Sequence, residues 1–401
     1  MFISKETKKF ILDHIDDDVF TLGFRASRYP EIDMPTAVVQ IEGRQKAKSK
    51  LPSWYSNPDV VYPPHLALEQ CSSETTAAYK AELVGGNTLV DLTGGLGVDS
   101  SCFAKQFDHV VYVERQERLC QLAAHNFVAL GLHNIETVNA DAIEYVQKMN
   151  PVDVIYVDPA RRDSQGGKVF AVSDCEPDIV VINDLLLSKA HKILVKLSPM
   201  LDVYAAMQQL KYPWEVHIVS VGGECKELLL LLDRNNCDSV SIHCVNLNKI
   251  SSQSFVFHRD EELSSVCYFT SVLSHYLYEP NASVLKAGAF KVLAVRFGIE
   301  KLHPNSHLYT SDKLVSDFPG KVFKICGYSS FNKKDLNLFL KGMKKANICV
   351  RNFPVAAAEL HKRFHLSDGG NDFLFATTLQ NGQHVIIRGE KIVMSSALRS
   401  D

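Results

Sequence analysis

Acidic side chains recur in this sequence where short apolar stretches end. Asp91 follows "TLV", Glu114 follows "HVVYV" and Asp158 follows "VDVIYV", while Asp141 comes soon after a fourth such stretch. If these stretches are parallel strands of one sheet, their carboxyl ends meet at one edge and the carboxylates gather there. So many carboxylates would repel a pyrophosphate, but they suit a ligand that carries amine, hydroxyl and amino donors.

A glycine-rich segment, "DLTGGLGVDS", connects the first apolar stretch to the next element. Glycines at such a turn allow a tight bend and leave room for a ligand to approach. By itself the turn could hold a dinucleotide, a mononucleotide or no ligand. The last glycine of the dinucleotide pattern is absent, because Ser100 occupies its place.

S-adenosylmethionine offers an ammonium group, a ribose diol, an exocyclic amino group and a sulfonium, and it therefore fits these acids. We predict that Glu114 accepts from both ribose hydroxyls, that Asp141 lies near the adenine amino group and that Asp91 lies near the ammonium group. Asp99 either contributes to the same site or caps a helix. The predicted cofactor contacts are Asp91, Thr93, Gly94, Gly95, Gly97, Asp99, Glu114, Arg115, Asp141, Ala142 and Asp158.

The elements that would position these residues alternate between strands and helices. Helical composition is expected at residues 5–15 and 35–48, followed by the proline-rich "LPSWYSNPDVVYPPH" and a capped helix that begins at Ser72 or Ser73. Strands are predicted at residues 88–92, 109–113, 135–138, 152–157, 192–197 and 215–221, with helices at 100–107, 116–130 and 142–149. This rhythm predicts an α/β fold with a Rossmann-like parallel sheet covered on both faces. "KELLLLLDR" is interpreted as part of a last edge pair.

The remainder of the chain has a different pattern. Two small α+β units are expected at residues 274–318 and 321–395, with Asn381-Gly382 as a hairpin turn and a helix at 354–364. The predicted division is a helical region at 1–85, a cofactor-binding domain at 86–237, linker strands with an α+β domain at 238–319, and a basic α+β domain at 320–401.

Basic residues are concentrated in one C-terminal segment of a chain whose net charge is −3. Residues 321–365 contain ten Lys and Arg against two acidic residues, a local charge of +8. An acidic body joined to a basic module is common in proteins that act on nucleic acid. The alternative is a helix face whose lysines are simply solvated.

Residues 72–235 resemble a class I S-adenosylmethionine-dependent methyltransferase. The resemblance rests on "DLTGGLGVD", Glu114, "NADA" at 139–142 and "DPAR" at 158–161. With its helical N-terminus and its tail, the chain resembles a bacterial methyltransferase family that carries a ferredoxin-like insert and a THUMP-like C-terminal domain. THUMP domains proper bind RNA and often accompany tRNA-modifying enzymes, so the resemblance implies S-adenosylmethionine as cofactor and RNA as substrate.

The "DPAR" segment differs from related motifs. Methyltransferases that modify exocyclic amino groups have Asp or Asn, two prolines and an aromatic residue; here Asp158 and Pro159 are kept, but Ala160 and Arg161 depart from the pattern. We predict catalytic roles for Asp158, which orients the acceptor, for Pro159, which fixes the turn, and for Arg161. Uridine C5 chemistry is rejected because "KLSPM" supplies Ser198 where that reaction needs a cysteine.

Substrate contacts are predicted at Arg161, Arg162, Lys196, Lys344, Lys345, Lys362 and Arg363, although Arg162 could instead pair with Asp163 or Asp174. No metal site is predicted, because the sequence has neither an HExxH motif nor a CxxC pair. The start of the chain lacks the apolar core of a signal peptide, and no apolar run reaches the roughly 20 residues of a membrane span. A cytoplasmic protein with reduced cysteines and no membrane partner is expected, and the oligomeric state is left open.

Three functions remain open at this point. The first is an RNA methyltransferase whose basic module delivers the substrate. The second is a methyltransferase for a small molecule or a protein. The third is a nucleic-acid-binding protein that retains the cofactor fold without catalysis.

Overall fold

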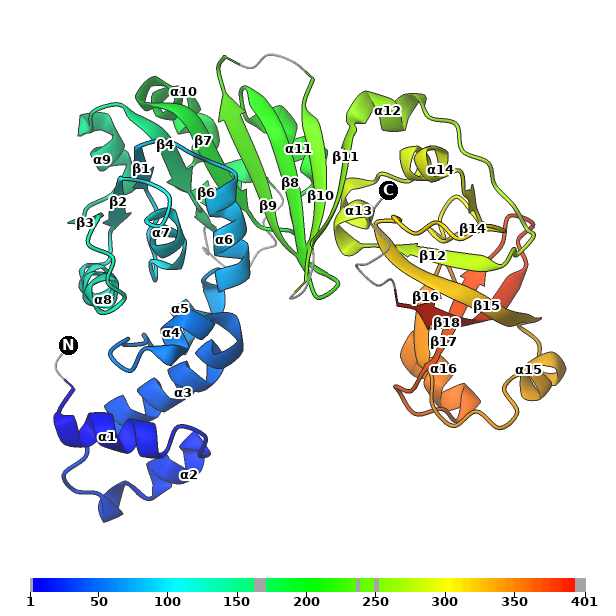
Figure 1. Cartoon of the computed structure of the whole chain (residues 1–401), viewed down its shortest axis with the longest axis horizontal. Coiled ribbons are helices and arrows are strands. Elements are labelled where there is room, and N and C mark those ends of the chain that lie inside the picture. Colours follow the sequence, from blue (N-terminus) through cyan, green and yellow to red (C-terminus); the bar gives the residue numbers. More distant parts are fainter. Residues whose placement is uncertain (1–2, 162–170, 236–238, 249–251, 394–401) are drawn as a thin grey trace. The chain divides into compact units, whose positions relative to one another are not determined.

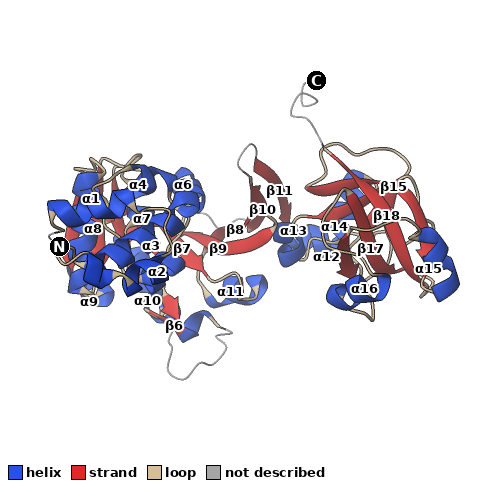
Figure 2. Cartoon of the chain, turned by 90° about the horizontal axis from the view of Figure 1, so that it is seen from below, coloured by secondary structure: helices blue, strands red, loops and turns tan. Residues whose placement is uncertain are grey.

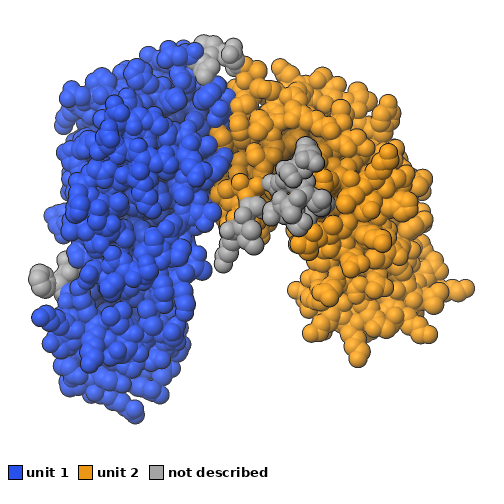
Figure 3. Space-filling view, in the orientation of Figure 1, with its two compact units in different colours: residues 1–216, 227–238 blue, residues 217–226, 239–401 orange. Residues whose placement is uncertain are grey.

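The computed structural model describes residues 3–161, 171–235, 239–248 and 252–393 of the chain. The chain divides into two compact units, coloured separately in Figure 3. The first contains residues 1–216 and 227–238, and the second contains residues 217–226 and 239–401. The predicted division into four parts stays a prediction.

A helical region opens the first unit (Figure 1). Several of its helices begin after a side chain that accepts a hydrogen bond from the first turn, among them Asp33 and Ser73. The helices expected at residues 5–15 and 35–48 are confirmed, as is Ser73 as a cap. The elements are α1 (Lys5–Asp13), α2 (Val19–Phe24), η1 (Ala26–Arg28), α3 (Met34–Lys50), α4 (Pro52–Ser56), α5 (His65–Gln70) and α6 (Glu74–Glu82).

A sheet of mainly parallel strands follows the helical region and forms most of the rest of the first unit. Its strands are β1 (Thr88–Asp91), β2 (His109–Glu114), β3 (Ile135–Asn139), β4 (Val152–Val157), β7 (Ala190–Leu197), β8 (Pro213–Val221) and β9 (Glu224–Asp233). Strands β7, β4, β1, β2 and β3 are parallel neighbours in that order, and β9 is antiparallel to β7. All six strands predicted for this sheet are confirmed within two residues at each end, and β4 matches its predicted range.

Helices follow most of these strands along the chain, and Figure 2 draws all helices in blue. They are α7 (Val98–Phe103), α8 (Glu117–Ala129), α9 (Ala142–Lys148), α10 (Ile179–Lys189) and α11 (Val203–Gln209). The short elements β5 (Ala160–Arg161), η2 (Val172–Asp174) and β6 (Cys175–Glu176) follow β4. After Asp153, strand β4 is apolar without alternation, and its last four side chains are buried, as a parallel sheet covered on both faces requires.

The interpretation of "KELLLLLDR" as an edge is wrong. It forms β9, and the sheet order continues beyond it through β8 to β10 (Ser241–Leu247) and β11 (Ser252–His258). Strand β9 pairs antiparallel with β7. An unbroken run of leucines, Leu228 to Leu232, is consistent with a strand that is buried rather than exposed at an edge.

The proline-rich segment is held from two sides by buried polar side chains. Gln40 on α3 exchanges two hydrogen bonds of 2.8 Å with the backbone of Tyr62. Asn126 on α8 does the same with the backbone of Val61, at 2.9 and 2.8 Å. Because buried backbone groups need partners, these amides fix the segment between the N-terminal helices and α8.

Seven strands of the second unit form one sheet in the order β13-β14-β12-β15-β18-β17-β16. Their bounds are β12 (Tyr276–Pro280), β13 (Glu300–Lys301), β14 (Tyr309–Ser311), β15 (Gly320–Ser330), β16 (Asn347–Arg351), β17 (Asp372–Thr378) and β18 (His384–Ile392). The helices are α12 (Arg259–Ser264), α13 (Ala282–Ala287), α14 (Lys291–Phe297), α15 (Lys333–Phe339) and α16 (Ala357–Phe364).

The two small α+β units that were expected share this sheet. Strand β12 pairs antiparallel with β15, with Leu277 opposite Phe323. Both residues belong to one apolar cluster that also contains Phe375 and Ile387 from β17 and β18. The hairpin at Asn381-Gly382 is confirmed. The helix predicted at 354–364 begins only at Ala357, because the proline at its expected start lies in the preceding turn.

Candidate active site

The carboxyl ends of β4 and β7 bring a carboxylate and an ammonium group into contact. Lys196 Nζ donates to Asp158 Oδ2 at 2.5 Å and lies 3.3 Å from Ser72 Oγ. The backbone N–H of Asp158 donates to Thr93 Oγ1 at 2.7 Å. Within the described parts of the chain, no hydrogen bond reaches Asp158 Oδ1. The network therefore engages one carboxylate oxygen and leaves the other for an additional donor.

The surroundings set the charges of this pair. The Asp158 side chain is 35% exposed and that of Lys196 is 12% exposed. Burial raises the pKa of the Asp158 carboxyl, and the neighbouring Lys196 opposes this rise. Burial would lower the pKa of Lys196, but the carboxylates of Asp158 and Asp99 raise it far above its usual range. Lys196 consequently stays cationic and acts as a hydrogen-bond donor rather than as a base.

A second lysine lies behind this pair. Lys80 on α6 is fully buried, and its Nζ donates to both carboxylate oxygens of Glu227 at 2.9 and 2.8 Å and to Ser72 Oγ at 2.8 Å. It also lies 3.1 Å from Asp99 Oδ1. Because Ser72 contacts both Lys80 and Lys196, its hydroxyl links the two ion pairs.

Asp99 is engaged by this network. It accepts from Ser72 Oγ at 2.8 Å and from the Tyr156 hydroxyl at 2.9 Å, besides its ion pair with Lys80. Burial would raise the pKa of the Asp99 carboxyl, but Lys80 and Lys196 outweigh it, so that the pKa is lowered. The interpretation of Asp99 as a helix cap is wrong, because Asp99 lies inside α7 and the cap position is Gly97. Neither that interpretation nor the predicted cofactor contact included this buried network.

Asp91 and Glu114, at the ends of β1 and β2, shape the glycine-rich turn between them. Asp91 accepts from Thr93 N at 3.0 Å and from Ser100 Oγ at 2.6 Å. Burial raises the pKa of Asp91 to about 7. Glu114 accepts from Gly95 N at 3.0 Å and from the following turn. Since a carboxylate has about four lone-pair sites, both retain acceptor capacity toward the predicted ammonium and ribose groups.

The three glycines of the turn have different constraints. A Cβ at Gly94 would lie 2.1 Å from the ring of Tyr112, and one at Gly97 would lie 2.6 Å from the ring of Phe127. Gly95 has a φ of +55° and no side chain near its Cβ position. Gly94 and Gly97 are therefore required by packing, whereas Gly95 has the open side that a bound cofactor needs.

The remaining predicted cofactor contacts lie at the ends of β2 and β3. Asp141 is exposed and caps α9, accepting from the backbone N–H groups of Ile143 and Glu144 at 2.8 and 3.2 Å. Ala142 follows it as the first residue of that helix. Arg115 Nη1 donates to Glu176 Oε1 at 2.8 Å on the surface. Asp141 and Arg115 therefore form local hydrogen bonds, and the cofactor contacts predicted for them stay predictions.

The "DPAR" segment is described in part. Pro159 is buried, and Ala160 pairs with Glu176 where β5 meets β6. The backbone of Arg161 belongs to β5, but its side chain lies outside the described part of the structure, as does all of Arg162. Their predicted substrate contacts stay predictions.

In the second unit, the basic segment is only partly free for a ligand. Glu279 is buried and pairs with Arg351 at 3.0 Å and with Lys321 at 3.4 Å. Two of the ten cations therefore neutralise a buried acid from outside the segment. The other eight are exposed: Lys324, Lys333, Lys334, Lys341, Lys344, Lys345, Lys362 and Arg363.

The predicted contacts of this segment come from two adjoining places. Ser367 N donates to Lys344 O at 3.0 Å, and Lys345 forms a β-bridge with Ser367, just beyond the end of α16. Lys362 and Arg363 lie in the last turn of that helix, and the guanidinium group of Arg363 lies 4.7 Å from the ring centre of Phe331. We call these four residues, Lys344, Lys345, Lys362 and Arg363, the basic cluster.

Sequence reasoning missed Ser72, Lys80 and Glu227 as parts of the site. The sequence contained a signal for Lys80, because this lysine lies at helical spacing from Thr76, Ala77 and Ala81, with which it shares the buried face of α6. Glu227 stands directly before the leucine run of β9. A charged residue on an otherwise apolar face indicates a buried ionic partner.

Family models match successive parts of the chain. One that describes a ferredoxin-like domain matches residues 276–319, and one that describes a THUMP-like domain matches residues 320–391. A third, protein-L-isoaspartate(D-aspartate) O-methyltransferase, matches residues 65–164, which contain the glycine-rich turn.

A solved structure is similar over nearly the whole chain. The crystal structure of a "putative methyltransferase" from Porphyromonas gingivalis W83 has 34% sequence identity and a TM-score of 0.87, and the match covers 98% of this chain and 100% of that one. This chain belongs to that methyltransferase family. The Rossmann-like fold class and the resemblance inferred from the sequence are thereby confirmed.

Curated relatives agree on the cofactor. Two proteins of Mycobacterium tuberculosis, from strains CDC 1551 / Oshkosh and H37Rv, are named uncharacterized S-adenosylmethionine-dependent methyltransferases. Each is 22% identical over 306 residues, which are 75% of this chain and 80% of its own. This methyltransferase is S-adenosylmethionine-dependent. Among its described residues, no helix is both long and apolar enough to cross a membrane.

Proposed function

We propose that this methyltransferase modifies RNA in the cytoplasm and that the basic cluster binds the RNA backbone. The observation that carries the proposal is the set of eight exposed cations between Lys324 and Arg363, which remains when Lys321 and Arg351, the two partners of Glu279, are left out. The match of residues 320–391 to a THUMP-like domain supports the same substrate class. Exposed Lys and Arg side chains bind phosphates without reading sequence, and so they suit delivery of a structured RNA.

The strand-end acids and the glycine-rich turn would hold the cofactor. Gly95 offers the open backbone, Glu114 the acceptors for the ribose hydroxyls, and Asp141 the acceptor for the adenine amino group. The residues present fit S-adenosylmethionine, because they are acceptors arranged around a turn with a free side at Gly95. Asp91 contributes negative charge for the ammonium group. The bound cofactor supplies an electrophilic methyl group on its sulfonium.

Asp158 orients the acceptor in this proposal. Lys196 holds Oδ2, so Oδ1 is the atom that receives a hydrogen bond from the group to be methylated. Thr93 fixes the backbone of Asp158, and Pro159 limits the freedom of the turn that follows. Orientation is the stronger role, because a carboxylate bound to an ammonium group is a poor base, whereas alignment of reactants lowers the barrier directly. Arg161 and Arg162 complete the substrate side as a stacking or phosphate contact.

The test uses methyl-labelled S-adenosylmethionine and the full chain. Separate pools of unmodified tRNA, rRNA, cellular protein and small metabolites are incubated with the protein, and the label is followed into each pool. We expect transfer into one RNA pool, and we expect it to fall steeply with added salt. The matched variant Lys344→Glu/Lys345→Glu should lose RNA binding, while Lys313→Glu, an exposed lysine of the same unit outside the basic segment, should retain it.

Other outcomes separate the alternatives. Label in protein or metabolites alone would replace the RNA proposal with a methyltransferase for those substrates, and would leave the basic cluster without its proposed purpose. Cofactor binding with no transfer to any pool, together with salt-sensitive RNA binding, would favour a binding protein that does not catalyse.

A further inference from the structure

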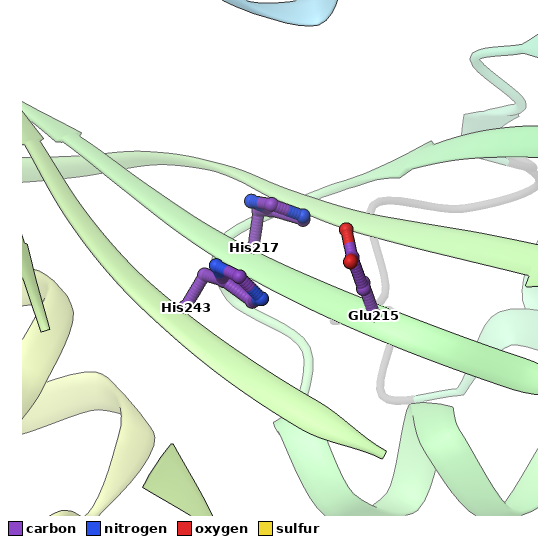
Figure 4. A group of neighbouring side chains, drawn as sticks. All are labelled: Glu215, His217 and His243. Atoms are coloured by element: carbon purple, nitrogen blue, oxygen red, sulfur yellow. The ribbon is translucent and has the colours of Figure 1, made fainter. Parts of the chain in front are cut away.

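Away from the strand-end acids, two histidine rings and a carboxylate converge on neighbouring strands (Figure 4). Glu215 and His217 lie on β8 with one residue between them, so their side chains project from the same face of the strand. His243 lies on β10, the neighbour of β8 in the sheet order. One oxygen of Glu215 and one ring nitrogen of each histidine all lie within 4.8 Å of one another.

The rings are packed face to face in a protected position. The centroids of His217 and His243 are 4.3 Å apart with an interplanar angle of 21°. His217 is only 2% exposed, while Glu215 and His243 are half-buried. The stacked contact therefore holds the two rings side by side, and a histidine ring binds a metal ion through a deprotonated ring nitrogen.

A neighbouring hydroxyl can orient one of the rings. Ser241, two residues before His243 on β10, has its Oγ 3.0 Å from His243 Nε2. When Nε2–H donates to this hydroxyl, Nδ1 carries the lone pair. Metal-binding histidines commonly have such an outer partner, which fixes the tautomer and the ring plane.

We propose that Glu215, His217 and His243 form a binding site for a divalent transition-metal ion of the Zn²⁺ class, separate from the S-adenosylmethionine site. Two imidazole nitrogens and one carboxylate oxygen are a ligand set that Zn²⁺ takes in proteins, with water at a fourth position. Mg²⁺ and Ca²⁺ are unsuitable because they prefer oxygen ligands throughout. The ion would connect β8 with β10.

The distances are compatible with this assignment. Ligand atoms around a tetrahedral zinc ion, each bound at about 2.1 Å, are about 3.4 Å apart. Separations of at most 4.8 Å need only small side-chain rotations to reach that value. Sequence reasoning found no metal motif because one of the three ligands lies on a different strand, 26 positions after His217.

The experiment uses the full chain, purified without a histidine tag and stripped of metal with a chelator. Zn²⁺ binding is measured by calorimetry, and Co²⁺ binding by visible absorption. We expect one ion per chain and a Co²⁺ spectrum without the intense bands of thiolate ligands. The absence of those bands would exclude the chain's cysteines as ligands; the nine among the described residues form no disulfide bond.

The test variants are Glu215→Gln and His243→Gln, because both side chains are only half-buried and their replacement leaves buried His217 in place. Each substitution should weaken Zn²⁺ binding by about tenfold or more, because loss of an outer-shell partner alone has an effect of that size. The matched controls are Glu224→Gln and His275→Gln, whose side chains are 74% and 78% exposed in surface ion pairs. Both controls should bind as the parent does.

A second readout is the thermal unfolding midpoint, which bound Zn²⁺ should raise in the parent and in the controls but not in the two test variants. The midpoints of all five proteins without metal show whether each variant is folded. Absence of binding by the parent, thiolate bands, or equal affinity in the parent and both test variants would overturn the proposal. In each of those cases, the three side chains are held by interactions within the protein alone.

Discussion

Asp158 Oδ2 and Lys196 Nζ form an ion pair of 2.5 Å that joins the ends of two neighbouring parallel strands. This pair explains why apolar strand β4 ends on a carboxylate. Lys196 was predicted as a substrate contact, and the structure places it as the partner of the residue predicted to orient the substrate. Partial burial of both side chains strengthens their interaction relative to a pair in open water.

Replacement of Lys196 should change the pH dependence of the reaction. In Lys196→Met the cation that opposes the effect of burial is lost, so the pKa of Asp158 should rise further. Protonated Asp158 no longer offers a charged acceptor, and the acidic limb of the kcat profile should therefore move to higher pH. Turnover of the labelled pool is measured between about pH 5 and pH 9. Lys192→Met, on the same strand, is the control, and an unchanged profile in both variants would contradict the pairing role.

Asp158 itself should affect turnover more than cofactor binding. Asp158→Ala removes the proposed acceptor but leaves the glycine-rich turn and Glu114 unaltered, so we expect kcat to fall by about 100-fold or more. Because Asp158 is also among the predicted cofactor contacts, the affinity for S-adenosylmethionine is measured by calorimetry, and turnover is compared at saturating cofactor. Near-normal turnover with intact cofactor binding would remove Asp158 from the reaction.

Alanine substitutions at two glycines of the same turn should affect different properties, cofactor affinity at Gly95 and stability at Gly97. Gly95→Ala places a Cβ in ordinary contact with Thr93 O, at 3.8 Å, and at a φ of +55°, which costs about 1 kcal/mol and should chiefly weaken binding of S-adenosylmethionine. Gly97→Ala brings a Cβ within 2.6 Å of Phe127 and should reduce the free energy of unfolding by about 2–4 kcal/mol. Urea unfolding and cofactor titration of both variants measure the two effects. A large stability loss at Gly95 with unchanged affinity would argue against an open cofactor side.

The buried lysine of α6 should matter far more for stability than a surface lysine. In Lys80→Met the carboxylates of Glu227 and Asp99 lose their ammonium partner inside the protein, and the free energy of unfolding should fall by about 3–5 kcal/mol. Lys46→Met removes partly exposed ion pairs with Glu42 and Glu69 and should cost about 0–1 kcal/mol. Urea unfolding compares the two. Equal effects would mean that the buried network contributes no more than a surface pair.

Asp91 should make the folded state less favourable as the pH rises. Its pKa is raised from 3.8 to about 7 in the folded protein, so the unfolded chain ionises first. Stability relative to Asp91→Asn should therefore decrease from about pH 4 to about pH 7 and then stay level, by at most about 4 kcal/mol. Unfolding curves of both proteins across this range test the sign. A difference that is constant with pH would show that Asp91 ionises normally.

Much of the first unit could be predicted because its strands are continuous apolar runs that end on acids or glycines. Strand β4 and the cap at Ser73 are local properties of the sequence. The interior place of β9 could not be predicted, since β10 and β11 extend the sheet beyond β8 and nothing within the β9 segment indicates this. Helix α16 starts later than predicted because Pro354 can either begin a helix or lie in a turn, and here it lies before the helix.

The candidate site shows the same limit. Asp158, Glu114 and the glycines were found because each follows a strand in the sequence. Ser72, Lys80 and Glu227 were missed because their contacts connect α6 with β9, two elements separated by 147 positions at the Lys80–Glu227 pair. The structure was also needed to show which basic residues are available to a ligand, because two of the ten, Lys321 and Arg351, pair with buried Glu279.

The pairing of β12 with β15 has a consequence for how this enzyme could have been assembled. The ferredoxin-like and THUMP-like segments meet at Pro319 and Gly320, but the sheet passes through this junction without interruption. A gene fragment that encoded only the THUMP-like segment would produce a protein whose β15 lacks its neighbour and exposes an unsatisfied backbone edge. Shuffling between enzymes would therefore favour transfer of residues 276–391 as a single cassette.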